Sequence, residues 1–278
     1  MMVSIHQGAP LAVNQEERAY RAWPILTRRA NDDEPITYGE LAEQLGMHHR
    51  PIRYVLDLIQ RHCLDEKLPP LTIIVVNQAG VPGSGFIAWD IADFATGQRM
   101  VSHYDWDASP NPFAYAADGA TVDELAERIQ ASPERAEEVY ALVKVRGVAQ
   151  IIFRQALLRV YRAQCAICGL SFEQALEGAH LIPWNDATWS QRMSPTNGVL
   201  LCSTHHRMLD GGLITITESH VVRYRDPDGK ARSYSGADHA ASTSLHGRKA
   251  LMPASPSWQP AKEALAHHHR RLLWDPLP

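Results

Sequence analysis

Two short motifs in the second half of the chain contain residues that commonly bind metal ions. Cys165-Ala-Ile-Cys168 and Cys202-Ser-Thr-His205 each hold two such residues at the same spacing. Each turn can supply two adjacent corners of a tetrahedral site, the geometry that thiolate and imidazole ligands form around zinc. The pattern predicts a structural Zn²⁺ site. The alternative is a set of reduced, buried thiols beside an exposed His205.

Polar residues suited to hydrolysis lie between and just after these motifs. His180 in EGAHLIPW, Asn197 in SPTNG and His206 in STHHRMLDGG have strand, loop and helix character in that order. On a helix beginning near Ser203, His206 and Asp210 share one face and become candidate ligands for a second, hard divalent ion, Mg²⁺ or Mn²⁺. His180 is the candidate general base, because a neutral imidazole accepts a proton from water near neutral pH.

Asn197 has two candidate roles. Its side chain can hydrogen-bond the backbone of the loop after His180 and so orient the imidazole, which is an indirect role. It can also be a direct ligand of the divalent ion. The residue types and spacing leave both roles open.

The elements in the first third of the chain predict a separate small domain. Thr37 and Glu40 form a capping box at the start of a helix that ends at Gly46, and a second helix is expected over about 49–63. LTIIVVN at 71–77 has the β-branched composition of a buried strand and is followed by a glycine-rich loop. This order of elements is typical of a winged helix. The expected role is DNA binding or sensing, and the alternative is a winged helix used for dimerisation or only as a packing module.

The fold class expected for the whole chain is α+β. We predict a winged-helix-like domain at 1–90, a connector at 91–145 that is helical from about 121, and a zinc-stapled domain at 146–278. That last domain is expected to end in a proline-rich loop and a helical tail. Residues 91–120 are expected to be irregular.

Basic residues concentrate in two places. Arg50 and Arg53 lie near the start of the second predicted helix, and the segment 144–162 lacks acidic residues. Phosphate contact is one interpretation of these residues, and a solvated helix face is the other. The candidate DNA-binding residues are Arg50, Arg53, Lys144, Arg146, Arg154, Arg159 and Arg162.

Composition limits the class of protein. The 278 residues are 45% hydrophobic and carry a formal net charge of −4, which disfavours a protein that coats nucleic acid nonspecifically. We expect no membrane segment and no signal peptide, hence a cytoplasmic protein, in which disulfides are disfavoured. Cys63 is expected to be a small buried apolar residue.

The segment from about 146 to 224 resembles the HNH endonucleases, which carry a ββα-metal (His-Me) finger. GVAQIIFRQALLRVYRAQCAICG, EGAHLIPW, TNGVLLC and HHRMLDGGLITI carry the resemblance, and it is closest to the C-terminal nuclease domains of modification-dependent restriction enzymes. The resemblance implies cleavage of DNA with His180 as base, Asn197 as the middle residue and His206 as the last histidine. Many members have Asp or His just before the base as a metal ligand, where this chain has Ala179.

A weaker resemblance covers about 50 residues of the first domain. ITYGELAEQLG, RPIRYVL and LPPLTIIVVNQAGVPGSGF are similar to the winged helix of alkyltransferase-like proteins, which implies recognition of DNA lesions with Arg50 or Arg53. The reactive cysteine of alkyltransferases would fall near 75–77 and is absent, so alkyl transfer is not expected.

The function expected from these features is a metal-dependent DNA endonuclease in restriction or phage defence. A homodimer is expected only on functional grounds, since double-strand cleavage usually needs two active sites. The alternatives are a DNA-binding or regulatory protein with an inactive HNH finger, and a phage-type nickase. The presence of His180, Asn197, His206 and Asp210 together favours the enzyme.

Overall fold

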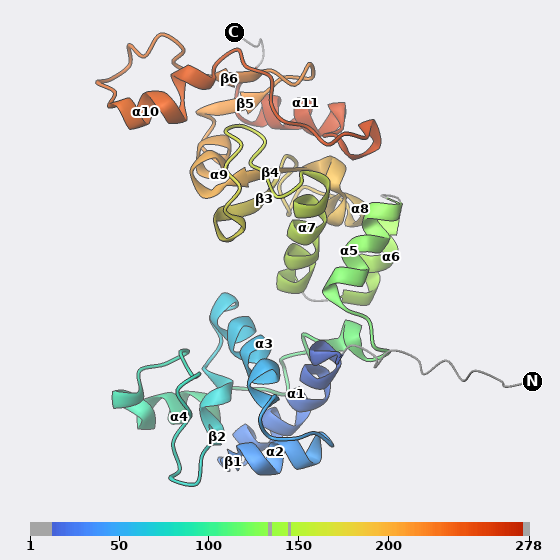
Figure 1. Cartoon of the computed structure of the whole chain (residues 1–278), viewed down its shortest axis with the longest axis vertical. Coiled ribbons are helices and arrows are strands. Elements are labelled where there is room, and N and C mark those ends of the chain that lie inside the picture. Colours follow the sequence, from blue (N-terminus) through green and yellow to red (C-terminus); the bar gives the residue numbers. More distant parts are fainter. Residues whose placement is uncertain (1–12, 133–134, 144–145, 275–278) are drawn as a thin grey trace, which may run out of the picture. The chain divides into compact units, whose positions relative to one another are not determined.

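The chain divides into two compact units, Met1–Thr121 and Val122–Pro278 (Figure 1). The computed structural model describes residues 13–132, 135–143 and 146–274. Lys144 and the side chain of Arg146 lie outside the described residues. Across the described ranges, every helix is too short or too polar to cross a membrane.

The first unit is mainly helical. Its long helices, α1 and α3, pack against each other and against the 3-10 turn η1. The elements are α1 Gln15–Asn31, β1 Ile36–Thr37, α2 Tyr38–Gln44, α3 Ile52–Asp65, η1 Leu71–Ile74, β2 Val75–Val76, η2 Ile91–Asp93, α4 Phe94–Ser102 and η3 Ala114–Ala116.

The two predicted helices of the first unit are present. The capping box of Thr37 and Glu40 begins α2, and α3 begins at Ile52, directly after Pro51, which is later than the expected start. Residues 94–102 were expected to be irregular but form α4, which packs on α1 and η1. Trp23 on α1 anchors this core, with its ring centroid 5.9 Å from that of Trp106.

The prediction of a strand at 71–77 is wrong for most of its residues. Residues 71–74 form the 3-10 turn η1, and only Val75 and Val76 pair, in parallel, with β1. Pro69 and Pro70 precede this turn and lack the N–H groups that a strand ladder needs, while Ile73 N–H closes back on Pro70 O at 2.8 Å. Within the described residues, 77–90 contain no second strand, so the β-hairpin wing of a winged helix is not formed there.

The second unit combines helices with two β-hairpins. Its elements are α5 Val122–Ala131, α6 Ala136–Val143, α7 Arg146–Val160, η5 Glu173–Ala175, β3 Leu176–His180, α8 Trp189–Met193, η6 Pro195–Asn197, β4 Gly198–Cys202, α9 Ser203–Asp210, β5 Ile214–Ile216, β6 Val222–Tyr224, α10 Gly236–Ala241, η7 Thr243–Leu245, η8 Pro256–Trp258 and α11 Lys262–Arg271.

The hairpin of β3 and β4, followed by α9, forms a ββα unit. The strands are antiparallel, with Leu176 opposite Cys202 and His180 opposite Gly198. Helix α7 packs on both strands. A Cβ atom at Gly178 would lie 3.0 Å from the Phe153 ring, and one at Gly198 would overlap it. The two glycines therefore let α7 approach the hairpin closely.

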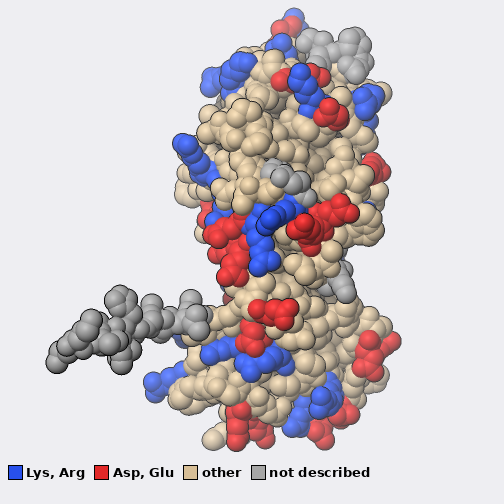
Figure 2. All heavy atoms as spheres, turned by 90° about the vertical axis from the view of Figure 1, so that its right-hand side faces the viewer, with Lys and Arg blue, Asp and Glu red and all other residues tan. Residues whose placement is uncertain are grey.

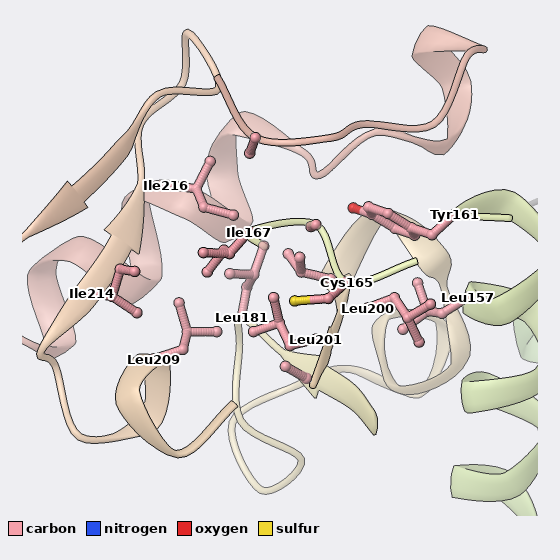
Figure 3. Close-up of a cluster of buried hydrophobic side chains, with 14 of the residues drawn as sticks. Leu157, Tyr161, Cys165, Ile167, Leu181, Leu200, Leu201, Leu209, Ile214 and Ile216 are labelled. Atoms are coloured by element: carbon pink, nitrogen blue, oxygen red, sulfur yellow. The ribbon is translucent and has the colours of Figure 1, made fainter. Parts of the chain in front are cut away.

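A cluster of buried side chains surrounds this hairpin in the second unit. Figure 3 shows the Cys165 sulfur between Leu181, Leu200 and Leu201, with Tyr161 close by. Backbone hydrogen bonds tie the first cysteine turn to its surroundings: Ala166 N–H donates to Leu200 O at 2.8 Å, and Ala166 O accepts from Leu251 N–H at 2.7 Å. The cysteine motif is therefore built into the core.

The expected C-terminal helix is present as α11 and packs through two buried histidines. His268 lies between Thr215 Oγ1, 3.2 Å from its Nδ1, and Leu209 O, 3.3 Å from its Nε2. His269 Nε2 donates to Ile216 O at 3.0 Å. Since Leu209 O is among the last carbonyls of α9, α11 closes the C-terminal end of the ββα unit.

Charged side chains are mixed on the surface. On the face drawn in Figure 2, Lys and Arg alternate with Asp and Glu, and no broad area of one sign is visible. This distribution agrees with the small net charge of −4. Binding to nucleic acid on this face would depend on individual basic residues and not on a general positive field.

Candidate functional site

The structure brings the four predicted zinc ligands together. One ligand atom from each of Cys165, Cys168, Cys202 and His205 lies within 4.8 Å of the others. The closest pair is Cys202 Sγ and His205 Nδ1, at 3.1 Å. Three sulfurs and one imidazole nitrogen fit a tetrahedral structural Zn²⁺ site. Among the described residues, this is the one group of metal-binding side chains so closely gathered.

The hydrogen bonds of His205 prepare it as a ligand. Its Nε2 lies 3.0 Å from the carbonyl oxygen of Ala241, which can only accept, so Nε2 carries the proton and Nδ1 faces the sulfurs. A hydrogen bond from Cys202, opposed by burial and assisted by His205, lowers the pKa of Cys165 to about 3. The same bond, together with burial, raises the pKa of Cys202. These contacts favour the thiolate form of Cys165, which is the form that binds zinc.

His180 lies at the end of β3 and is oriented by its backbone and aromatic neighbours. Its ring stacks on Phe153, with centroids 3.9 Å apart and planes 12° apart. Its Nε2 is 2.8 Å from the carbonyl oxygen of Arg192, so Nε2 donates and the neutral ring has its lone pair on Nδ1. In that tautomer Nδ1 is the basic nitrogen of the ring.

Arg192 is itself held by three aromatic rings. Its guanidinium carbon lies 4.7 Å from the ring centroid of Trp189 and 5.2 Å from that of Trp184, and its Nη1 donates to the Tyr140 hydroxyl at 3.3 Å. Its Nε also donates to Trp184 O at 3.0 Å. These contacts hold α8 in place and with it the carbonyl that orients His180.

Asn197 is buried and makes backbone contacts at both ends of its amide. Its Oδ1 accepts from Ile182 N–H at 2.8 Å, and its Nδ2 donates to Ile182 O and Gln191 O, both at 3.1 Å. The side chain therefore joins the loop after β3 to the end of α8. With 2% of its surface exposed, it has the contacts expected for orienting the His180 loop.

His206 lies between two carboxylates. Its Nδ1 is 2.6 Å from Glu177 Oε2 on β3, and its Nε2 is 3.4 Å from Asp210 Oδ2, four residues later on α9. Ser203 Oγ donates to the other oxygen of Glu177 at 2.5 Å. The predicted pair of His206 and Asp210 thus shares one helical face, and Glu177 is an additional member that the sequence analysis missed.

The candidate catalytic residues occupy two faces of the hairpin. His180 shares the α7 face with Gly178 and Gly198, because all three lie against Phe153. Glu177 lies on the opposite face, with α9 and His206, since successive strand residues alternate. His180 and Glu177 are three residues apart along β3.

Two of the predicted DNA-binding arginines have partners within the unit. Arg154 donates from Nε to Leu176 O at 2.8 Å and from Nη2 to Glu173 O at 2.6 Å. Arg159 forms ion pairs with Asp123 and Glu127 on α5 at 3.2 and 3.0 Å. Both side chains join elements of the fold. Arg162, by contrast, is exposed just after α7.

Arg50 and Arg53 are both exposed in the first unit. The Arg53 guanidinium lies 4.7 Å from the ring centroid of Tyr54 and donates to its hydroxyl at 2.7 Å. This pair borders a cavity of about 470 Å³ that is also lined by Tyr38 and Phe86. Thr72 lines the same cavity, and its buried hydroxyl has no hydrogen-bond partner in the described structure.

Sequence reasoning missed the residues that orient the site. Glu177 precedes Ala179 by two positions on the strand, so it lies on the same face, and strand alternation could have identified it. Phe153 and Arg192 act through a ring face and a backbone carbonyl, respectively. Their residue types give no local signal for such contacts.

Comparisons with known proteins identify the domain that holds this site. Residues 165–217 match the family model described as HNH endonuclease. A solved structure described as a modification dependent TagI restriction endonuclease is similar, with 15% identity, a TM-score of 0.29 and coverage of 43% of this chain and 36% of that chain. The chain thus spans about a third of that protein, and no curated protein matches. The segment that supplies His180, Asn197 and the helix of His206 therefore matches an HNH endonuclease domain.

Proposed function

We propose that this nuclease hydrolyses DNA phosphodiester bonds with the help of a divalent ion, and that it acts in restriction or phage defence. The observation that carries the proposal is the oriented imidazole of His180, whose Nε2 donates to Arg192 O at 2.8 Å. Its Nδ1 is then the atom that takes a proton from an attacking water. The defence setting rests on the resemblance to modification-dependent restriction enzymes.

His206 and Asp210 are the residues that would hold the ion. Their facing atoms, Nε2 and Oδ2, are 3.4 Å apart, and imidazole nitrogen with carboxylate oxygen suits Mn²⁺ or Mg²⁺. When bound, the ion would supply Lewis-acid stabilisation of charge on the phosphate. The amide oxygen of Asn197 accepts a hydrogen bond from Ile182 N–H, and this favours the orienting role over direct ligation of the ion.

DNA contact is proposed for exposed basic residues of both units. Arg162 follows α7 in the nuclease unit, and Arg50 and Arg53 lie at the start of α3. The cavity beside Arg53 has aromatic walls and an unpartnered hydroxyl, features that fit a planar base with a polar edge. We propose that the first unit recognises DNA in this way, as its resemblance to alkyltransferase-like proteins implies.

Mutation of the base tests the proposal directly. We expect His180→Ala to reduce plasmid cleavage by roughly 10²-fold or more, while DNA affinity changes little, because a general base acts mainly in the transition state. His103→Ala is the matched control, since His103 is exposed and lies in the other unit. Cleavage of supercoiled plasmid is measured in Mg²⁺ and in Mn²⁺, on modified and unmodified DNA.

The same assay separates the alternatives. Nicked product that never becomes linear indicates the nickase, and DNA binding without cleavage in either ion indicates the regulatory protein. A His180→Ala variant that cuts at the wild-type rate rejects His180 as the base.

A further inference from the structure

Glu177 is hydrogen-bonded to two residues of α9, His206 and Ser203. Its Oε2 lies 2.6 Å from His206 Nδ1, and its Oε1 accepts from Ser203 Oγ at 2.5 Å. Both donors come from α9, so the two oxygens of the carboxylate are anchored to that helix.

An ionised carboxylate can only accept hydrogen bonds, and this constrains the ring of His206. At 2.6 Å from Glu177, Nδ1 must carry a proton. A neutral ring then has its lone pair on Nε2, which faces Asp210 Oδ2 at 3.4 Å. Two acceptors at this distance repel each other unless a cation lies beside both, so the arrangement suits an ion bound by Nε2 and Oδ2.

We propose that Glu177 is a positioning residue for His206, holding the imidazole in the Nδ1–H form so that Nε2 and Asp210 can bind the divalent ion of the nuclease. This inference rests on the proposed function, because it uses the ion site proposed there. It gives Glu177 an indirect role on the strand side of the site. Ala179, the next residue of β3 on the same face as Glu177, has no side-chain atom that binds a metal ion.

The anchoring of Glu177 supports an orienting role over direct ligation. Both carboxylate oxygens already have partners, one on Ser203 and one on His206. The strand fixes the backbone of Glu177 opposite Leu201, and α9 supplies both Ser203 and His206. Carboxylates that orient a metal-binding histidine contribute about 10–100-fold to metal affinity or activity.

The first test measures the protonation of the two ring nitrogens of His206. Nitrogen-15 NMR of the full-length, zinc-containing protein in saturating Mg²⁺ reports which nitrogen of His206 is protonated, with the signal assigned by its loss in His206→Gln. We expect a protonated Nδ1 and a bare Nε2 in the wild type, and a mixture of both tautomers in Glu177→Ala. A bare Nδ1 in the wild type overturns the proposal, as does a ring protonated on both nitrogens.

The second test measures affinity for Mn²⁺ by calorimetry. We expect Glu177→Ala to weaken binding by about 10–100-fold and Glu177→Gln by only a few-fold, because the Gln carbonyl still accepts from Nδ1 and Ser203 can accept from the amide. Glu218→Ala is the control, since this glutamate is exposed and belongs to the same unit. Its ion pair with Lys262 is long, at 4.0 Å. Equal losses in the Gln and Ala variants would indicate a direct ligand and overturn the proposal.

Saturating Mn²⁺ should restore most cleavage in Glu177→Ala, since the missing function is ion binding. Cleavage that stays low at saturation contradicts the positioning role. If Glu177→Ala does not fold, as judged by circular dichroism and zinc content, Glu177→Gln and the NMR measurement still decide. The Asp210→Asn variant separates the proposed ion site from the proposed role of Glu177. If this variant binds Mn²⁺ with wild-type affinity, the ion site is rejected. The NMR measurement alone decides whether Glu177 positions His206.

Discussion

At the residue scale, the partner on one ring nitrogen decides what each histidine of the site can do. His180 and His205 both donate from Nε2 to a backbone carbonyl, so Nδ1 is the basic nitrogen of the neutral His180 ring and the nitrogen that faces the sulfur cluster in His205. His206 is reversed, with Nδ1 directed at Glu177. Residues of one type therefore take different roles in a single small domain.

A strong response to pH is expected of His268 on α11. It is fully buried, and burial lowers its pKa to about 4 from 6.5. The folded state thus favours the neutral ring, and this contribution to stability is complete above about pH 6.5 and lost as pH falls toward 4. We expect the free energy of unfolding to drop by about 2 kcal/mol at pH 5 from this group alone.

Urea denaturation at several pH values tests this expectation. His268→Gln has no titrating ring, so its stability should vary less between pH 6.5 and 5 than that of the wild type. The exposed His239 provides the control, because His239→Gln should keep the wild-type pH dependence. If His268→Gln loses as much unfolding free energy at acid pH as the wild type, the loss comes from other groups. His62 is one of them, because burial also lowers its pKa to about 4.

At the element scale, the cysteine motifs connect pieces of chain that are too short to be stable alone. Strand β4 has five residues and α9 has eight, and both meet at Cys202. Helices of this length are marginal without tertiary support. The cluster of Cys165, Cys168, Cys202 and His205 supplies that support to the hairpin and helix that position the proposed catalytic residues.

We therefore expect about one zinc per chain in protein purified without added metal, measured by elemental analysis. Cys202→Ser should be insoluble or unfolded in the nuclease unit, because binding of structural zinc is largely folding free energy. Cys63→Ser is the matched control: Cys63 is also buried but lies on α3, so its variant should keep its zinc. A folded, zinc-free preparation of the wild type contradicts the assignment.

At the scale of the whole molecule, the two units divide recognition and cleavage in the proposed function. The nuclease unit begins at Val122, because Arg159 of α7 pairs with Asp123 and Glu127 of α5. A fragment covering 122–278 contains every group proposed for chemistry. It should nick DNA weakly and without sequence preference.

Recognition by the first unit is tested by a salt titration of DNA binding. The double variant Arg50→Glu/Arg53→Glu should bind more weakly and with a slope of log affinity against log salt reduced by about 2, since about one counterion is released per phosphate contact. Arg18→Glu/Arg28→Glu on α1 makes the same change of charge and should keep the slope. Equal slopes for the wild type and the Arg50/Arg53 variant would show that these two arginines do not contact phosphate. DNA contact would then be assigned to Arg162 in the second unit.

The sequence alone determined the features that depend on local spacing. The zinc ligands, the pairing of His206 with Asp210 and the capping box at Thr37 all follow from residues within a few positions of each other, where helix and turn geometry sets the distance. The order of strand, loop and helix around His180 and Asn197 was also predictable, because each element has its own local signal.

Only the tertiary structure decided the features that depend on long-range packing. The run at 71–77 has strand composition, yet two preceding prolines and burial against α1 and α3 turn most of it into a 3-10 turn. Glu177 meets His206 only because β3 packs on α9, and Arg154 and Arg159, basic in sequence, become internal links. Local composition reports what a side chain can do, whereas its partner is chosen by elements that fold against it from elsewhere in the chain.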